Sequence, residues 1–188
     1  CRTMMRPKRN RSRVLVAKTV AIVVVVGGGL VGAWRAGGDE SRRAQEEEEN
    51  VLLRGTFARL EDEFDPPIEV VYQGSRPQTA RPKGVLLILH GCSHSATDAW
   101  PRSASCQECV GLPIETAIVA AALSRNWAVA AVSSVDRRAK CWTPHKDATR
   151  LAKAVDFVAK ATHSRTRFVA AIGASSGGAM ATRLTTRD

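Results

Sequence analysis

The sequence predicts an α/β fold built on an open, mostly parallel sheet, and two observations predict it. Three apolar runs, within residues 80–91, 127–134 and 167–175, show no alternation with polar residues, which is typical of strands buried on both faces. Helical periodicity follows each run, at residues 114–126, 145–161 and 176–184. Strands that alternate with helices imply parallel pairing through right-handed crossovers.

The N-terminal segment carries most of the net charge of +10. Residues 1–38 contain 8 of the 28 Lys and Arg residues and none of the 18 Asp and Glu residues. The rest of the chain is therefore nearly neutral, and it shows no basic stripe with interleaved aromatic residues. We expect no nucleic-acid partner.

Residues 1–13 form a basic head, and residues 14–34 form an apolar stretch whose only charge is Lys18. This stretch reaches the roughly 20 residues that cross a bilayer if Lys18 extends to the interface. The positive charge before it retains the N-terminus in the cytosol. We therefore predict a signal-anchor, hence a single-pass type II membrane protein with a lumenal or extracellular body. The alternatives are a signal peptide cleaved near residues 31–33, which gives a secreted protein, an organelle transit peptide, or a buried helix.

Residues 35–66 are rich in charge and poor in apolar side chains, so we predict a stalk. It includes a short helix through Phe57 and Leu60 and ends at the Pro66-Pro67 pair. The folded domain is then expected to cover residues 67–188, and it begins with an alternating strand at residues 68–74.

The sequence GASSG at residues 173–177 satisfies the pattern G-x-S-x-G between a predicted strand and a predicted helix. A nucleophilic serine must project from a sharp, strained turn, which requires small flanking residues such as Gly173 and Gly177. The following helix N-terminus supplies amide donors beside a developing oxyanion. Ser175 is therefore the candidate nucleophile. A plain glycine-rich turn is the alternative, whereas the spacing fits neither a P-loop nor a dinucleotide fingerprint.

A catalytic serine needs a second backbone donor, normally from the loop after an earlier strand. His90-Gly91-Cys92 ends the apolar run at 80–91 and occupies that place. We predict that the amides of Cys92 and Ser176 form an oxyanion hole. His90 is expected to brace the loop rather than to act as a base, and no cofactor or metal is expected.

The segments HGCSHSATD, Cys141-Trp142 and GASSGGAMA together resemble the α/β-hydrolase superfamily, and more narrowly its poly(3-hydroxybutyrate) depolymerase and feruloyl-esterase-like branch. The resemblance covers residues 68–188, the N-terminal half of such a domain. It implies a three-layer α/β/α hydrolase fold and serine-dependent hydrolysis of a carboxylic ester, in a small molecule or a polymer. Ser175 is the implied nucleophile, and the amides of Cys92 and Ser176 are the implied oxyanion hole. The segment ASCQECVGLP departs from the branch and leaves the substrate open.

In this superfamily the triad acid and histidine follow the serine. After Ser175 the sequence contains only Asp188 and no histidine. We therefore expect a fragment truncated after the nucleophile elbow, inactive alone, with its sheet open at the strand that carries Ser175. His94 is the one histidine expected near Ser175, as a substrate-side or structural residue.

Four cysteines lie in the body, namely Cys92, Cys106, Cys109 and Cys141, and they allow three disulfide connectivities. Translocation would expose them to an oxidising compartment. The resemblance places the strands ending at His90 and Ser134 side by side, which implies a Cys92–Cys141 disulfide and leaves Cys106–Cys109 as a local one. A redox-active Cys-x-x-Cys, a zinc site and reduced thiols remain alternatives.

Two other functions are compatible with these patterns. A serine peptidase of the prolyl-oligopeptidase type shares the fold and the Gly-Gly pair after the serine, although no carboxylates stand near these loops to hold a substrate amino terminus. A non-catalytic, membrane-tethered hydrolase-like module that only binds its ligand belongs to a different class. A missing acid or base would favour that module.

Overall fold

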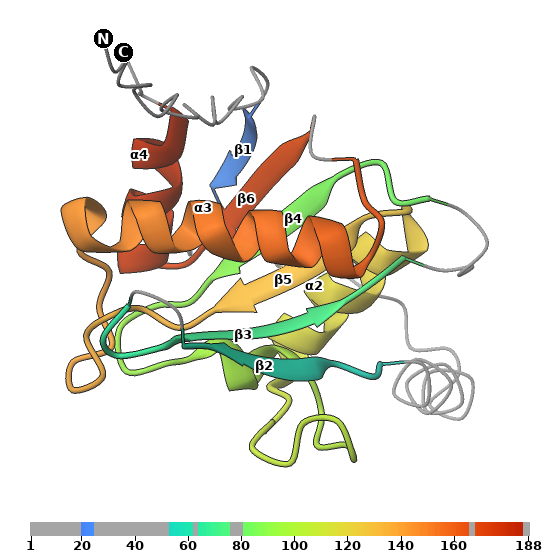
Figure 1. Ribbon diagram of the computed structural model, residues 1–188, viewed down its shortest axis with the longest axis horizontal. Coiled ribbons are helices and arrows are strands. Elements are labelled where there is room, and N and C mark those ends of the chain that lie inside the picture. The colour runs from blue at the N-terminus through green and yellow to red at the C-terminus, as the bar shows by residue number, and fades with distance from the viewer. Residues whose placement is uncertain (1–19, 25–52, 62–63, 76–80, 166–167, 186–188) are drawn as a thin grey trace, which may run out of the picture.

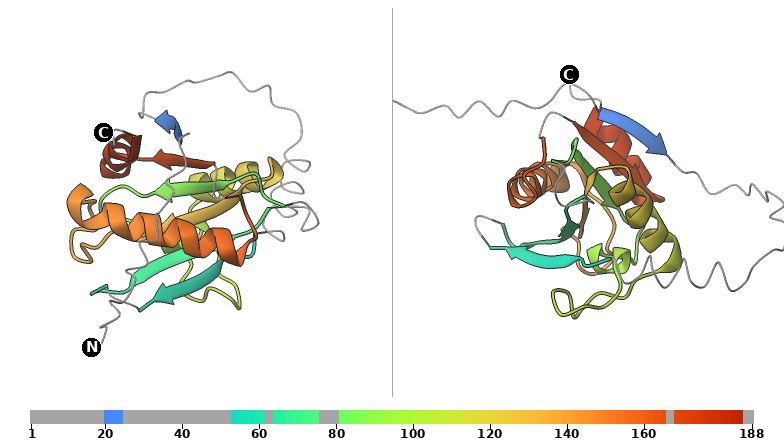
Figure 2. Two further views of the ribbon diagram at one scale, coloured as in Figure 1. Left: turned by 45° about the horizontal axis from the view of Figure 1, so that its top comes forward. Right: turned by 90° about the vertical axis from the view of Figure 1, so that its right-hand side faces the viewer.

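The structure is a computed structural model that describes residues 20–24, 53–61, 64–75, 81–165 and 168–185. Within them it shows an α/β fold whose six-stranded sheet has the order β1-β6-β4-β5-β3-β2. Helices α3 and α4 cover one face of the sheet, and α2 with the short 3₁₀ helix η1 covers the other (Figures 1 and 2). The sheet thus forms the middle of three layers.

The strands and helices follow the apolar and periodic segments of the sequence closely. The strands are β1 Val20–Val24, β2 Thr56–Leu60, β3 Ile68–Gln73, β4 Val85–Leu89, β5 Ala128–Val132 and β6 Val169–Gly173. The helices are η1 Ala96–Ala99, α2 Pro113–Ser124, α3 Pro144–Ala161 and α4 Ser176–Thr185. Both α2 and α3 begin with proline, which suits the first helical position because its backbone needs no N–H there.

The centre of the sheet is parallel, as the sequence predicts. Strand β4 pairs in parallel with β5 on one side and with β6 on the other. All five residues of β5 are buried, because helices pack on both faces at this point. The continuous apolar runs therefore do mark strands buried on both faces.

The sheet as a whole is mixed, which corrects the prediction of a mostly parallel sheet. Strand β3 runs antiparallel to β5, and β2 runs antiparallel to β3. The link between β2 and β3 is short, at residues 61–67, and a parallel pair would need a crossover of a dozen or more residues. Antiparallel pairing is therefore the geometry that this link permits.

Strand β2 also corrects the expected helix through Phe57 and Leu60. Residues 56–60 form the edge strand, and Ala58 and Leu60 pack against the core on the α3 side while Phe57 packs on the opposite side. The sheet thus extends into the segment assigned to the stalk. Residues 25–52, 62–63 and 1–19 lie outside the described residues, and with them most of the predicted head, apolar stretch and stalk.

Strand β1 lies inside the apolar stretch at residues 14–34 and pairs in parallel with β6 (Figure 1). Its sequence VAIVV is rich in β-branched residues, which suit a strand. We expected the sheet to be open beside β6, and the structure instead gives β6 a neighbour on each side. Among the described helices, none has the length and apolar character that crossing a bilayer requires.

The parallel strands place three loops at one edge of the sheet. His90 follows β4, Ser133 follows β5, and Ala174 follows β6. The carboxyl ends of parallel strands are where open α/β sheets gather their functional groups. The candidate site lies at this edge.

Candidate functional site

Ser175 occupies a sharp turn between β6 and α4. Its φ angle is +50°, in the left-handed region that residues other than glycine seldom adopt. Such a conformation costs about 1–3 kcal/mol, which the surrounding structure must supply. The turn is held by hydrogen bonds from the Ala174 N–H to the Leu89 carbonyl at 3.2 Å and from the Gly177 N–H to the Ala174 carbonyl at 2.8 Å. Ser175 is exposed at the tip of this turn.

The two glycines of the motif are required by close backbone contacts. A Cβ atom on Gly173 would overlap the carbonyl group of Gly177. A Cβ atom on Gly177 would overlap the carbonyl group of Leu89 at the end of β4. Backbone atoms cannot move aside as a flexible side chain can, so both positions exclude any side chain. The sequence motif therefore has a steric cause in this turn.

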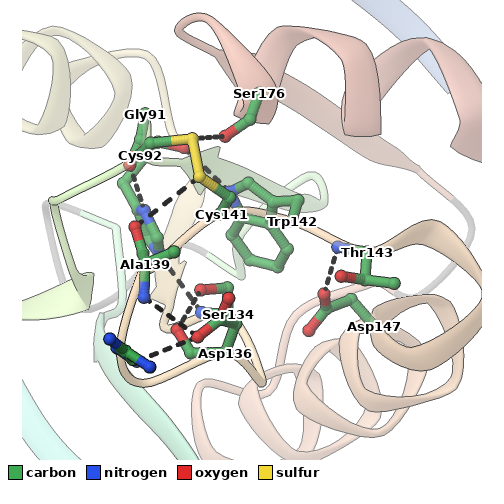
Figure 3. Close-up of a disulfide and its surroundings, with 12 residues drawn as sticks. Gly91, Cys92, Ser134, Asp136, Ala139, Cys141, Trp142, Thr143, Asp147 and Ser176 are labelled. Atoms are coloured by element: carbon green, nitrogen blue, oxygen red, sulfur yellow. Dashed lines mark hydrogen bonds between the residues drawn. A yellow bond between two sulfur atoms is a disulfide. The ribbon is translucent and has the colours of Figure 1, made fainter.

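The loop after β4 lies against the same turn. A Cβ atom on Gly91 would stand 3.7 Å from the Cβ atom of Ser175. The Ser176 hydroxyl donates a hydrogen bond to the Cys92 sulfur at 3.3 Å (Figure 3). In the described part of the chain, neither the Cys92 N–H nor the Ser176 N–H has a hydrogen-bond acceptor. The backbone N–H groups of Cys92 and Ser176 are therefore both available as donors. These two residues contact each other beside Ser175.

A disulfide ties this loop to the loop after β5. Cys92 and Cys141 are bonded, with an S–S distance of 2.01 Å and Cα atoms 4.4 Å apart (Figure 3). The Ser93 N–H also donates to the Ala139 carbonyl at 3.1 Å, which adds a second connection between the same two loops. The second disulfide joins Cys106 to Cys109, both buried on the α2 side of the sheet. These are the two pairs that the resemblance to the α/β-hydrolase superfamily implies.

His90 uses both ring nitrogens within the loops. Its Nδ1–H donates to the Gly91 carbonyl at 2.7 Å, and its Nε2 accepts the Ser134 N–H at 3.1 Å. Trp142 packs on the imidazole with ring centroids 5.0 Å apart, and its Nε1–H donates to the His90 carbonyl at 2.8 Å. Burial lowers the pKa of His90, although the hydrogen bond to Gly91 opposes this effect. The imidazole is therefore a neutral brace whose nitrogens have no free position for a substrate proton.

A cavity of about 540 Å³ opens beside Ser175. Its polar side includes His94 and Asp98, and the His94 Nδ1–H donates to the Asp98 carboxylate at 2.8 Å. The Asp98 carboxylate also accepts the Ser95 N–H at 3.2 Å, so its position is fixed from two sides. The sequence analysis missed this histidine–carboxylate pair. The four-residue spacing between His94 and Asp98 was the available signal in the sequence. His94 lies in a loop and Asp98 in a short 3₁₀ helix, so no helical periodicity singles out the pair.

The other two histidines of the described residues lie away from this cavity. His145 lies in the first turn of α3, and His163 follows the end of that helix. Neither residue lines the cavity. Asp188 lies outside the described residues. Within the described ranges, no cluster of three or more His, Cys, Asp and Glu residues could hold a metal ion.

The chain matches no protein-family model, and it matches no curated protein.

Proposed function

We propose that the protein hydrolyses a carboxylic ester with Ser175 as the nucleophile. The observation that carries the proposal is the left-handed Ser175 at a strand-to-helix turn, with the unoccupied amides of Cys92 and Ser176 beside it. Residues in sparsely populated backbone regions cluster at active sites, where the surrounding structure holds them in place. Backbone donors without acceptors are the groups that an oxyanion hole requires.

In the proposed reaction, the Ser175 oxygen attacks the ester carbonyl carbon while a base accepts the hydroxyl proton. The carbonyl oxygen becomes an oxyanion that receives hydrogen bonds from the Cys92 and Ser176 amides. Collapse of this tetrahedral intermediate breaks the ester C–O bond, and the alcohol leaves with the proton. Water then attacks the acyl group on Ser175 by the same route and releases the acid.

The resemblance to the α/β-hydrolase superfamily supports this proposal, and so does the arrangement of the sheet. Strands β4 and β5 are parallel neighbours, as that resemblance implies, and the loops that follow them are joined by the Cys92–Cys141 disulfide. We propose that the domain is the N-terminal half of such a hydrolase fold. The two disulfides also support a body in an oxidising compartment.

A specific observation favours a base within the described residues, in contrast to the expected histidine after Ser175. His94 lines the same cavity as Ser175 and has its Nδ1–H oriented by Asp98. A histidine oriented by a carboxylate beside a serine is the arrangement that activates nucleophiles. The variant His94→Gln separates the two arrangements. If His94 is the base, Ser175 in the variant should be labelled at least tenfold more slowly than in the parent. If the base follows Ser175 in the chain, the variant should be labelled at the parent rate.

The nucleophile itself is tested by labelling with a fluorophosphonate and by turnover of a simple ester. Ser175→Ala should abolish both, because the attacking oxygen is removed. Ser176→Ala is the matched control, since it keeps the backbone amide and should retain most of the activity. Equal labelling of the Ser175→Ala protein would overturn the proposal.

A further inference from the structure

The cavity beside Ser175 has an apolar floor built by three neighbouring strands. Ile88 of β4 is paired in register with Ala131 of β5 and with Ile172 of β6. These three residues therefore form a row across the sheet, and all three line the cavity. Side chains in one register row point to the same face of the sheet, and these three pack in the same cluster as α2 residues, so the row faces the layer that contains α2.

Helix α2 and the 3₁₀ helix η1 supply the walls. Ile114 and Ile118 of α2 and Ala99 of η1 line the cavity. Ile118 packs against the core on this side of the sheet, whereas Ile114 is 73% exposed and stands at the rim. The interior is thus apolar on floor and wall, with an exposed apolar side chain at its edge.

Four ionisable side chains line the cavity, namely His90, His94, Asp98 and Glu115. His94 and Asp98 satisfy each other through their hydrogen bond, and His90 uses both ring nitrogens within the loops. Gly91 and Ser175 line the cavity as well, so the reacting centre lies at its boundary. A volume of about 540 Å³ is within the range of small-molecule sites, which is roughly 300–1,000 Å³.

We propose that this cavity binds an apolar chain attached to the ester that Ser175 cleaves, and that Ala131 sets the length of chain that fits. This inference rests on the proposed function and adds its substrate class. In this row Ile88 lies between Ile172 and Ala131, and the small side chain of Ala131 beside Ile88 leaves the space that a larger residue would fill. The apolar chain of the substrate can belong to the acyl part or to the alcohol part of the ester, because the cavity recognises the same apolar chemistry in both.

Two series of esters test the proposal. One keeps p-nitrophenol as the alcohol and lengthens the acyl chain from acetyl to decanoyl, and the other keeps acetate and lengthens the alcohol. Each buried methylene is worth about 0.8 kcal/mol, so kcat/KM should rise about fourfold per methylene in one series until the cavity is full. The series that rises identifies the part of the ester that enters.

Ala131→Leu should remove this rise, because the added carbons occupy the floor of the cavity. Ala121→Leu is the matched control, since Ala121 is exposed on α2 and does not line the cavity. Ile114→Ser provides a second test that does not disturb the core, and it should weaken the rise by removing an apolar contact at the rim.

The outcomes separate this inference from the proposed function. A flat profile in both series, or an unchanged profile in both Ala131→Leu and Ile114→Ser, overturns the apolar pocket even if a small fluorophosphonate labels Ser175. Failure of the parent protein to label at Ser175 overturns the proposed function and this inference together. A rise that Ala131→Leu abolishes while Ser175 labelling persists supports both.

Discussion

Removal of the Cys92–Cys141 disulfide tests whether the oxyanion loop depends on its covalent tether. We consider the double variant Cys92→Ala, Cys141→Ala, which removes both sulfurs of this disulfide and retains the backbone amide of residue 92. The disulfide joins residues 49 apart in sequence. The chain-entropy relation for a loop of that size gives a loss of about 4 kcal/mol in the free energy of unfolding. We expect a measured loss in the lower part of the usual range of about 2–5 kcal/mol, because the sheet core carries most of the stability.

The effect on catalysis should be distinct from the effect on stability. The Cys92 amide survives the substitution, but the loop that carries it loses its bond to the loop after β5 and the sulfur that accepts the Ser176 hydroxyl. Complete loss of one oxyanion donor costs about 10²–10³ in rate. We therefore expect a smaller fall in kcat, with KM nearly unchanged, because the donor acts on the transition state.

The assay compares kcat, KM and urea unfolding with those of a matched control, Cys106→Ala with Cys109→Ala. That control removes a disulfide between residues only 3 apart, for which the same relation gives a loss below about 2 kcal/mol. Its kcat should equal the parent value. The reasoning is refuted if the Cys92, Cys141 variant loses stability but keeps the parent kcat, or if both double variants lose kcat equally.

Three further substitutions or conditions test the account of the site. Gly177→Ala should abolish labelling of Ser175 and cost at least about 1–3 kcal/mol of stability by overpacking, since its Cβ atom overlaps the Leu89 carbonyl; an unchanged melting temperature contradicts this. Because burial lowers the pKa of His90, the unfolded state takes up a proton near pH 6.5 before the native state does. The free energy of unfolding should therefore fall as the pH drops below about 6.5, and less so in His90→Gln; equal slopes in urea unfolding between pH 7 and 5 argue against the neutral brace. Asp147→Ala should cost more than about 2 kcal/mol, because the fully buried carboxylate accepts the Thr143 N–H (Figure 3) and the Val135 N–H, which would both lose their acceptor; a loss within 0.5 kcal/mol in the same measurement contradicts this.

The central strands could be predicted because burial on both faces leaves a direct mark in the sequence. The run at residues 85–89 has no polar residue, and neither has the run at residues 128–132. The edge strands leave a weaker mark. Phe57 and Leu60 are three residues apart, a spacing that fits a helix, and their five-residue strand is too short to show its alternation clearly. The short link after them then decides the antiparallel pairing, which no periodicity reveals.

The candidate site could be predicted where it depends on local chain geometry. Gly173 and Gly177 mark the turn at Ser175 because steric exclusion acts within a few residues. The cavity floor could not be predicted in this way, since the row of Ile88, Ala131 and Ile172 depends on strand register. Apolarity alone also does not reveal that residues 20–24 pair with β6 as strand β1, because that pairing depends on the sheet order.

Peptide mapping of the fluorophosphonate adduct tests the central claim most directly. The protein is labelled, digested and analysed by mass spectrometry, and the parent is compared with Ser175→Ala. The account predicts one adduct, on Ser175, that is absent from the variant. An adduct on another residue, or ester turnover by Ser175→Ala at the parent rate, would contradict it.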